Sequence, residues 1–403
     1  AANAMGRALL MLMIFAPAVI GEEKQDMYEP IRFATFNVSM EADNYKDANS
    51  SKGTISLINA LRTGQHPQIK NIAEIIQRVR PDVILLNEFD YIEDTQAGIE
   101  LFKSKYLSVS QQGQAAIDYP FVYLAPVNTG VPTDLPKQTQ NEQPRRLTHY
   151  GFGKYPGQYG MVLLSKFPII DEGIRTFQTF LWKDMPNNVM PINPDGTSWY
   201  NKDEVDIMRL SSKSHWDIPL RVNGQVIHVL ASHPTPPVFD GSEDRNGRRN
   251  HDELRFWKDY IQADQNTYHY DDNGKKGGLL TNPVVQRQLS VLESNKTAEA
   301  NLAPKFVILG DLNASDVEGD AYPGAAVQLL KHPLINQYPA PTSQGGIENN
   351  QYAKRKSDHA ATHTAGWGMR ADYVLPSANL EVVDSAVFWP ASNEPTARLV
   401  KDR

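Results

Sequence analysis

The segment Lys305–Ser315, KFVILGDLNAS, places a carboxylate beside a carboxamide at the end of an expected strand. Its apolar, β-branched run Phe306–Leu309 is typical of a buried strand, and Gly310 lets the backbone turn sharply at its end. Asp311 and Asn313 are separated by one residue, so the strand period of two points both side chains the same way. The carboxylate can hold a metal or align a water while the carboxamide donates to an oxyanion. Taken alone, the stretch also fits a turn that closes a strand, because Gly, Asp and Asn commonly form turns.

Other polar residues follow or begin expected strands elsewhere in the chain. Asn37 ends the alternating run IRFATFN, and Glu88 comes just after the apolar run DVILL. His233 follows the expected strand Gln225–Ser232, and Asp372 lies in the strand Ala371–Leu375. Each of these alone is also consistent with a solvated turn residue. If they converge on one rim they form a site, because scaffolds present function where strands stop and loops begin.

The hydrophobic periodicity predicts short strands, some of them joined as hairpins, with single helices between them. A helix begins at Pro67 and carries Ile69, Ile72, Ile76 and Val79 at helical spacing. Asn223-Gly224 predicts a tight hairpin turn. Further expectations are a strand over Val205–Leu210, a charged loop over Ser242–Asn250, a helix over Asp252–Ile261, and a closing pair of strands over Ala371–Leu375 and Glu381–Trp389. Because helices and strands do not alternate regularly, the pattern favours two packed sheets with helices outside over a doubly wound parallel sheet.

Composition limits the chemistry of the chain. The 403 residues carry a net charge of −7, which gives no global attraction to nucleic acid or anionic membranes. The sequence has no cysteine, which excludes disulfides, thiolate catalysis and zinc–thiolate sites. Any metal is therefore left to carboxylate, amide and imidazole ligands.

The N-terminal residues resemble a Sec-type signal peptide over residues 1–21. Arg7 precedes the almost wholly apolar run Ala8–Ile20, and Gly21 and then charged residues follow. The run is shorter than the roughly 20 residues that a membrane-spanning helix needs. We therefore expect a secreted or periplasmic protein without a transmembrane segment in its mature chain. A retained N-terminal anchor is the alternative.

The order of these motifs resembles the endonuclease/exonuclease/phosphatase superfamily, whose members include deoxyribonuclease I. The resemblance rests on FATFN, LLNEFD, YGMVLLSKFP, LASHPTPP, VILGDLNAS and ADYVLPS, which span roughly residues 31–390. It implies an α+β fold, a four-layer αββα sandwich of two mainly antiparallel sheets flanked by helices. It also implies one such domain over residues 22–403. The Pro-, Gly- and turn-rich composition near 126–158 and 183–202 predicts surface insertions in this domain.

The resemblance further implies roles for individual residues. Glu88 would be the main ligand of a divalent cation, with Asn37 beside it. The cation expected is Mg²⁺, with Mn²⁺ or Ca²⁺ as alternatives, because oxygen ligands suit hard cations. Asp311 would align or deprotonate the attacking water, Asn313 would donate to the developing phosphorane, and His233 would donate to the phosphate. Asp372 would orient a second histidine that also contacts the phosphate.

Two arginines are candidate substrate ligands. Arg248 and Arg249 follow His233 closely in the sequence, and guanidinium groups suit phosphate oxygens. Salt bridges to the neighbouring acidic residues are an equal alternative.

The sequence departs from the family pattern near its C-terminus. The family ends with Ser-Asp-His after the Asp-Tyr strand, whereas Ser357-Asp358-His359 lies before Asp372 here. We expect a chain truncated before its last catalytic histidine. The alternative is that His359 or His363 fills that role from a rearranged loop.

These observations predict a secreted, divalent-metal-dependent phosphoesterase that uses a metal-site water for in-line attack. The substrate classes that stay open are nucleic acid, phospholipid and small phosphate esters, and no protein partner is implied. The alternative is a catalytically impaired secreted binding module of the same fold.

Overall fold

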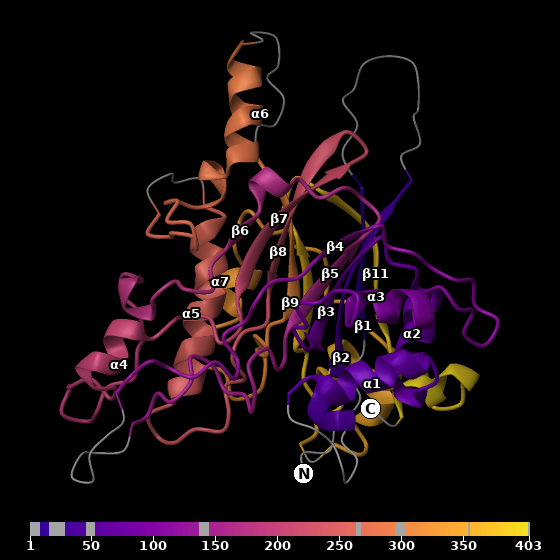
Figure 1. Cartoon of the computed structure of the whole chain (residues 1–403), viewed down its shortest axis with the longest axis horizontal. Helices are drawn as coiled ribbons and strands as arrows, with labels where there is room; N and C mark the ends of the chain where they lie inside the picture. The colour runs from indigo at the N-terminus through magenta and orange to yellow at the C-terminus, as the bar shows by residue number, and fades with distance from the viewer. Residues whose placement is uncertain are drawn as a thin grey trace.

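Two β-sheets packed face to face form the centre of the molecule (Figure 1). The computed structural model describes residues 9–15, 29–45, 53–136, 145–262, 267–294, 303–353 and 355–401. Apolar side chains from both sheets fill the space between them, among them Phe33, Leu85, Trp216 and Ile308. Burial of this shared apolar face is the main force that holds the sheets together.

The two sheets are mixed but mainly antiparallel. The six-stranded sheet has the order β11-β1-β2-β3-β5-β4, and the five-stranded sheet has the order β10-β9-β8-β7-β6. The pairs β2–β3 and β8–β9 are parallel, and the other described pairs are antiparallel. The strands are β1 Leu9–Phe15, β2 Ile31–Met40, β3 Val83–Phe89, β4 Phe121–Tyr123, β5 Met161–Ser165, β6 Arg175–Thr176, β7 His215–Val222, β8 Gln225–Ser232, β9 Lys305–Asp311, β10 Asp372–Pro376 and β11 Glu381–Phe388.

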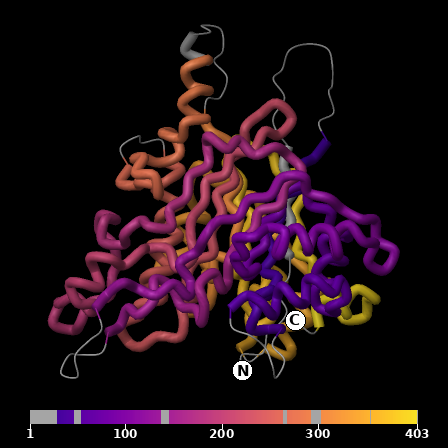
Figure 2. The backbone as a smooth tube through the Cα atoms, viewed as in Figure 1, coloured from indigo at the N-terminus to yellow at the C-terminus, as the bar shows by residue number. Residues whose placement is uncertain are grey.

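Helices cover the outer faces of both sheets, which confirms the predicted four-layer α+β sandwich. Helices α1 (Ile55–Thr63), α2 (Pro67–Val79) and α3 (Ile99–Phe102) pack on the six-stranded sheet, and α5 (Arg245–Tyr260) lies on the opposite side (Figure 1). The remaining helices are α4 Lys202–Ile207, α6 Pro283–Ser294, α7 Val327–Leu330 and α8 Gln344–Asn349. Figure 2 shows most of the N-terminal third of the chain on one side and most of the middle third on the other, and the C-terminal part runs from α6 at the upper left through the centre to the lower right.

Helix α2 has the bounds that its sequence predicts. Pro67 occupies its first turn, where the missing N–H costs nothing. Its buried isoleucines face the sheet, and it ends where Arg80 adopts a left-handed conformation (φ 51°) before Pro81. The carboxyl end of this helix leads directly into β3, which carries Glu88.

Three sequence expectations were wrong. The strand expected over Val205–Leu210 begins as helix α4, because Asn201 and Glu204 form a reciprocal capping box that starts a helix. The loop expected over Ser242–Asn250 contributes the first turns of α5. The last two strands do not pair with each other, since β10 lies in the five-stranded sheet and β11 in the six-stranded sheet.

The apolar N-terminal run is also part of a sheet in this structure. Leu9–Phe15 forms β1, which pairs antiparallel with both β2 and β11. The rest of the expected signal peptide lies outside the described residues. No helix in the described part of the chain has the length and apolar character needed to cross a membrane.

Candidate metal and catalytic site

Five strands bring polar side chains to one edge of the sandwich. The parallel pairs β2–β3 and β8–β9 end on the same side, and they carry Asn37, Glu88 and Asp311, with His233 directly after β8. Antiparallel β10 begins where β9 ends, so Asp372 lies across from Asp311. The predicted convergence of strand ends therefore exists in the structure.

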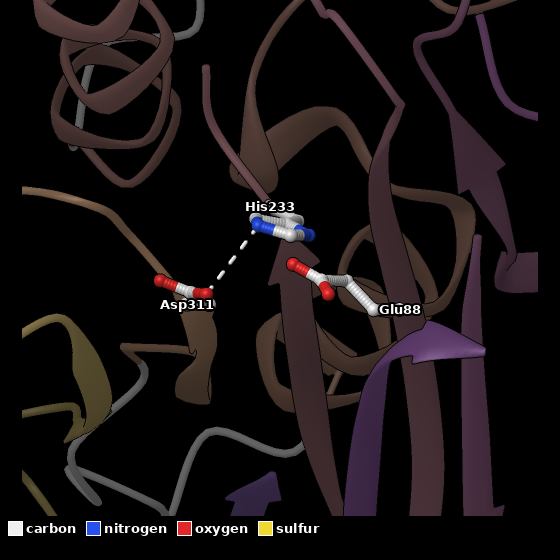
Figure 3. A group of neighbouring side chains, drawn as sticks. All are labelled: Glu88, His233 and Asp311. Carbon is white, nitrogen blue, oxygen red and sulfur yellow. Dashed lines mark ion pairs between the residues drawn. The ribbon is translucent and has the colours of Figure 1, made fainter. Parts of the chain in front are cut away.

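Glu88, His233 and Asp311 form a compact group at this edge. One potential ligand atom from each lies within 4.8 Å of the others. Figure 3 shows the three side chains pointing toward one another, with His233 Nε2 3.4 Å from Asp311 Oδ2. His233 and Asp311 are buried, whereas Glu88 is partly exposed. A cation or substrate could therefore approach the group from the Glu88 side.

Asp311 is the centre of the hydrogen bonding at this site. Its Oδ2 accepts a hydrogen bond from Asn37 Nδ2 at 3.0 Å, and its Oδ1 accepts one from the Asn313 backbone at 3.3 Å. Asn37 Oδ1 in turn accepts the Ser39 N–H at 3.1 Å. Asn37 thus fixes the carboxylate of Asp311, a role that the sequence did not predict.

The GDLN segment takes its shape from close packing. A Cβ on Gly310 would lie 2.0 Å from the Ser232 carbonyl oxygen, so only glycine lets β9 approach β8 this closely. The sharp turn comes later, at Asn313, whose φ is 53°. Its Nδ2 donates to the Pro234 carbonyl at 3.0 Å, which ties the turn to the loop after His233.

Glu88 adopts a left-handed backbone conformation with φ 60°, which is uncommon for a non-glycine residue. The neighbouring Asp90 helps to hold it there. The buried carboxylate of Asp90 accepts the Ala42 N–H at 2.8 Å, the Tyr155 hydroxyl at 2.6 Å and the Tyr159 N–H at 3.0 Å. These bonds connect the end of β3 to the segment after β2 and to the turn before β5.

A second buried carboxylate lies near Glu88. Glu41 accepts a hydrogen bond from Gln158 Nε2 at 2.7 Å. Burial raises the pKa of Glu41, and the nearby charges of Asp43 and Glu88 raise it further. Burial likewise raises the pKa of Asp90 to about 7. Tyr155 and Gln158, in the segment expected to be a surface insertion, are therefore buried beside the site.

Asp372 has a different partner from the predicted one. Its Oδ2 accepts the Thr364 hydroxyl at 2.7 Å, and the same hydroxyl accepts the N–H groups of Ala371 and Asp372 at 2.9 and 3.0 Å. The expectation that this carboxylate orients a second histidine is thus not met at Oδ2. His363 Nε2 instead lies 2.7 Å from Glu318 Oε1, and His359 is exposed.

The two predicted substrate arginines differ in their surroundings. Arg249 is buried, and its Nε and Nη2 donate to the carbonyls of Tyr150, Arg209, Leu210 and Ser211. Its donors therefore hold loops together, which does not support the predicted phosphate contact. Arg248 is partly exposed, lies over the Tyr322 ring at 5.1 Å and donates to the Val189 carbonyl at 3.3 Å. Its role in substrate binding stays a prediction.

Comparison with known proteins gives a consistent family match. The Endonuclease/Exonuclease/phosphatase family model matches residues 34–394. No curated protein sequence matches the chain.

Solved structures that resemble the chain share little sequence identity with it. An endonuclease/exonuclease/phosphatase from Beutenbergia cavernae DSM 12333 has 15% identity and a TM-score of 0.39, and the match covers 94% of this chain and 66% of that one. Beta toxin from Staphylococcus aureus with bound magnesium ions has 14% identity and a TM-score of 0.37, covering 86% and 83%. Truncated TDP2 from Caenorhabditis elegans has 13% identity and a TM-score of 0.30, covering 79% and 78%.

Proposed function

Because the chain belongs to the endonuclease/exonuclease/phosphatase family, we propose that it is a divalent-metal-dependent phosphoesterase that hydrolyses a phosphodiester or phosphomonoester. The observation that supports this most directly is the group formed by Glu88, His233 and Asp311, whose ligand atoms lie within 4.8 Å of one another. Asn37 joins this group through its hydrogen bond to Asp311.

The donor set suits a hard cation. Two carboxylates and an imidazole face one another, and the partly exposed Glu88 leaves room for the waters that Mg²⁺ retains. Glu88 is the residue we assign to hold Mg²⁺, with Mn²⁺ or Ca²⁺ as alternatives. The chemistry that such an ion supplies when bound is Lewis-acid polarisation of a phosphoryl oxygen.

The residues of the chain itself would position and deprotonate the nucleophile. The buried carboxylate of Asp311 is held by Asn37 and by the Asn313 backbone, so it can align a water and accept its proton. His233 lies beside it as a donor to a phosphoryl oxygen. The Asn313 amide has a second N–H that can stabilise the charge developing in the transition state.

The substrate and the location of the enzyme are further parts of this proposal. Nucleic acid, phospholipid and small phosphate esters all contain the bond that the site would cleave. The apolar run Ala8–Ile20 after Arg7 supports export to the periplasm or medium.

A second candidate is a catalytically impaired binding module of the same fold. The observation that favours it is the hydrogen bond from the Thr364 hydroxyl to Asp372, at the carboxylate that was expected to orient a second histidine. Such a protein would bind a phosphoester and turn it over slowly.

Hydrolysis of bis-p-nitrophenyl phosphate and p-nitrophenyl phosphate tests the proposal. We expect turnover that requires Mg²⁺, stops with EDTA, and falls at least about a hundredfold in Glu88→Ala. Glu93→Ala is the matched control, because Glu93 is exposed and lies five residues further along the chain. Equal turnover by wild type and Glu88→Ala would remove the metal assignment. Binding of both esters with slow turnover or none would favour the binding module.

A further inference from the structure

Arg370 carries a guanidinium group that has no ion pair with any described residue. The residue is partly buried, and its Nε lies inside the protein without a hydrogen-bond partner. Its guanidinium carbon lies 4.3 Å from the centre of the Tyr373 ring. Within the described residues, no carboxylate forms an ion pair with Arg370.

A cation in this position is costly, because burial removes hydration from the charge and no hydrogen bond or ion pair among the described residues replaces it. Burial lowers the pKa of Arg370, while Tyr373 and Asp316 act in the opposite direction. Asp316 is exposed and therefore compensates weakly. The face of the Tyr373 ring contributes an additional, modest attraction.

The register of the strands places Arg370 at the edge that carries the catalytic residues. Asp372 lies across from Asp311, and the ladder continues with a 2.7 Å hydrogen bond from the Leu312 N–H to the Ala371 carbonyl. Arg370 directly precedes Ala371 and lies two residues before Asp372 in the chain. The Tyr373 hydroxyl donates to the Ala314 carbonyl at 2.7 Å, so the ring beneath Arg370 is fixed to the segment that follows Asn313.

We propose that Arg370 binds a second phosphate group of the substrate, next to the phosphate that is cleaved. A guanidinium presents parallel N–H donors that match phosphate oxygens, and a stacked aromatic ring holds its plane in place. This inference rests on the proposed function and narrows it to phosphodiesters that carry a neighbouring phosphate. A free phosphate ion would satisfy the same chemistry, so the test separates the two sources.

The first arm of the test compares three substrates. Thymidylyl-thymidine is used without a terminal phosphate, with a 5′-phosphate and with a 3′-phosphate. We expect the wild-type protein to prefer one phosphorylated form in kcat/KM, and Arg370→Gln to lower that preference about tenfold or more. Arg355→Gln, at an exposed arginine before β10, should keep the preference. No preference in the wild type, or the same preference in Arg370→Gln, would overturn the proposal.

The second arm does not depend on turnover. Inorganic phosphate in the presence of EDTA should raise the Tm of the wild type and of Arg355→Gln, and should raise that of Arg370→Gln much less. This result without hydrolysis of any substrate would support the anion site and contradict the proposed function. The opposite result is hydrolysis of the substrates with neither a preference nor a phosphate effect that depends on Arg370. It would support the proposed function and contradict the anion site.

A third variant covers the case in which Arg370→Gln does not fold. Arg370→Lys keeps the positive charge over the Tyr373 ring but loses the planar fork of donors. We expect it to fold and to show a smaller preference for the phosphorylated dinucleotide. An unchanged preference in folded Arg370→Lys would show that the guanidinium does not contact the second phosphate.

Discussion

Asn37 donates a 3.0 Å hydrogen bond to Asp311 and so joins the ends of two strands, one from each sheet. The same Oδ2 of Asp311 lies 3.4 Å from His233 Nε2. The position of the carboxylate therefore depends on how the two sheets are packed. This links the stability of the sandwich to the geometry of the site.

Asp311→Asn tests the role of this carboxylate. We expect kcat for bis-p-nitrophenyl phosphate to fall about 10²- to 10⁴-fold with little change in KM, because an amide of the same shape cannot accept the proton of a water. Steady-state kinetics measure the effect, and circular dichroism checks folding. Asp316→Asn, at an exposed position in the following loop, is the control. A loss of less than threefold would show that Asp311 is not the base.

Thr364→Val tests the unexpected partner of Asp372. The substitution keeps the shape of the side chain and leaves a carboxylate oxygen and two backbone N–H groups without their hydroxyl partner. We expect the free energy of unfolding to fall by about 1–3 kcal/mol. Urea denaturation gives the value. Thr362→Val is the control, because its hydroxyl donates to a single carbonyl at the surface, and it should cost less.

His359 and His363 can be separated by their environments. His359 is exposed, so His359→Ala should leave turnover within about twofold. His363 is buried against Glu318, so His363→Ala should lower stability more than it lowers kcat in the protein that remains folded. Turnover and Tm of both variants check this. A hundredfold loss of kcat with unchanged Tm in either variant would support the rearranged-loop hypothesis.

The sequence predicted which side chains meet at the ends of the strands because their signals are local. Each follows or begins a short apolar run, and strand ends can be recognised within a few residues. The buried residues beside the site, such as Tyr155 and Gln158, could not be found in this way. Tyr155 reaches Asp90 across 65 residues and Gln158 reaches Glu41 across 117, and no periodicity encodes such pairs.

The assignment of Arg249 to substrate binding lacks support for a related reason. Hydropathy places a cluster of arginines in solvent, yet Arg249 is buried because four backbone carbonyls surround its guanidinium. Arg370 stands alone in the sequence, and its place two residues before Asp372 matters only because the strand register sets Asp372 across from Asp311. The partner of Asp372 has no spacing signal either, since Thr364 comes from the loop before β10.

Acid should destabilise the fold through two buried histidines. Burial lowers the pKa of His215 to about 4 and that of His269 to about 3. Nε2 of each ring forms a 2.9 Å hydrogen bond with a backbone carbonyl of helix α5. The carbonyl belongs to Glu253 in the case of His215 and to Phe256 in the case of His269. As the pH falls, these histidines take up protons near pH 6.5 in the unfolded chain and only at lower pH in the folded one. The two histidines therefore contribute their full stabilisation above about pH 6.5, and this contribution declines below it. We expect a loss of about 2 kcal/mol for each histidine at pH 5.

Urea unfolding of the wild type and His215→Gln at pH 7 and pH 5 measures this effect. The variant should lose less stability between the two pH values, while His359→Ala should behave as the wild type. The comparison between proteins is needed because Asp90 acts in the opposite sense. Burial raises the pKa of Asp90 to about 7, so the folded protein favours the protonated carboxyl group. The contribution of this group to stability is therefore largest at low pH and is lost as the pH rises through 7. The same pH dependence in His215→Gln and wild type would contradict the assignment.

The proposed export of the protein can be tested through strand β11. In the described sheet β11 lies at the edge and pairs with β1, whereas β10 pairs with β9 in the other sheet. If a signal peptidase cleaves after Gly21, β1 is removed and the amides of Glu381–Phe388 lose their partner strand. We expect mass spectrometry of the exported protein to show a chain that begins at Glu22.

The amides of Glu381–Phe388 should then exchange hydrogen faster in the cleaved protein than they do in the full chain. The exchange rates of Asp372–Pro376 should be the same in both proteins, which makes this strand the internal control. An exported protein that retains Leu9–Phe15, with β11 protected, would instead make β1 a permanent strand of the sheet and contradict the signal-peptide hypothesis.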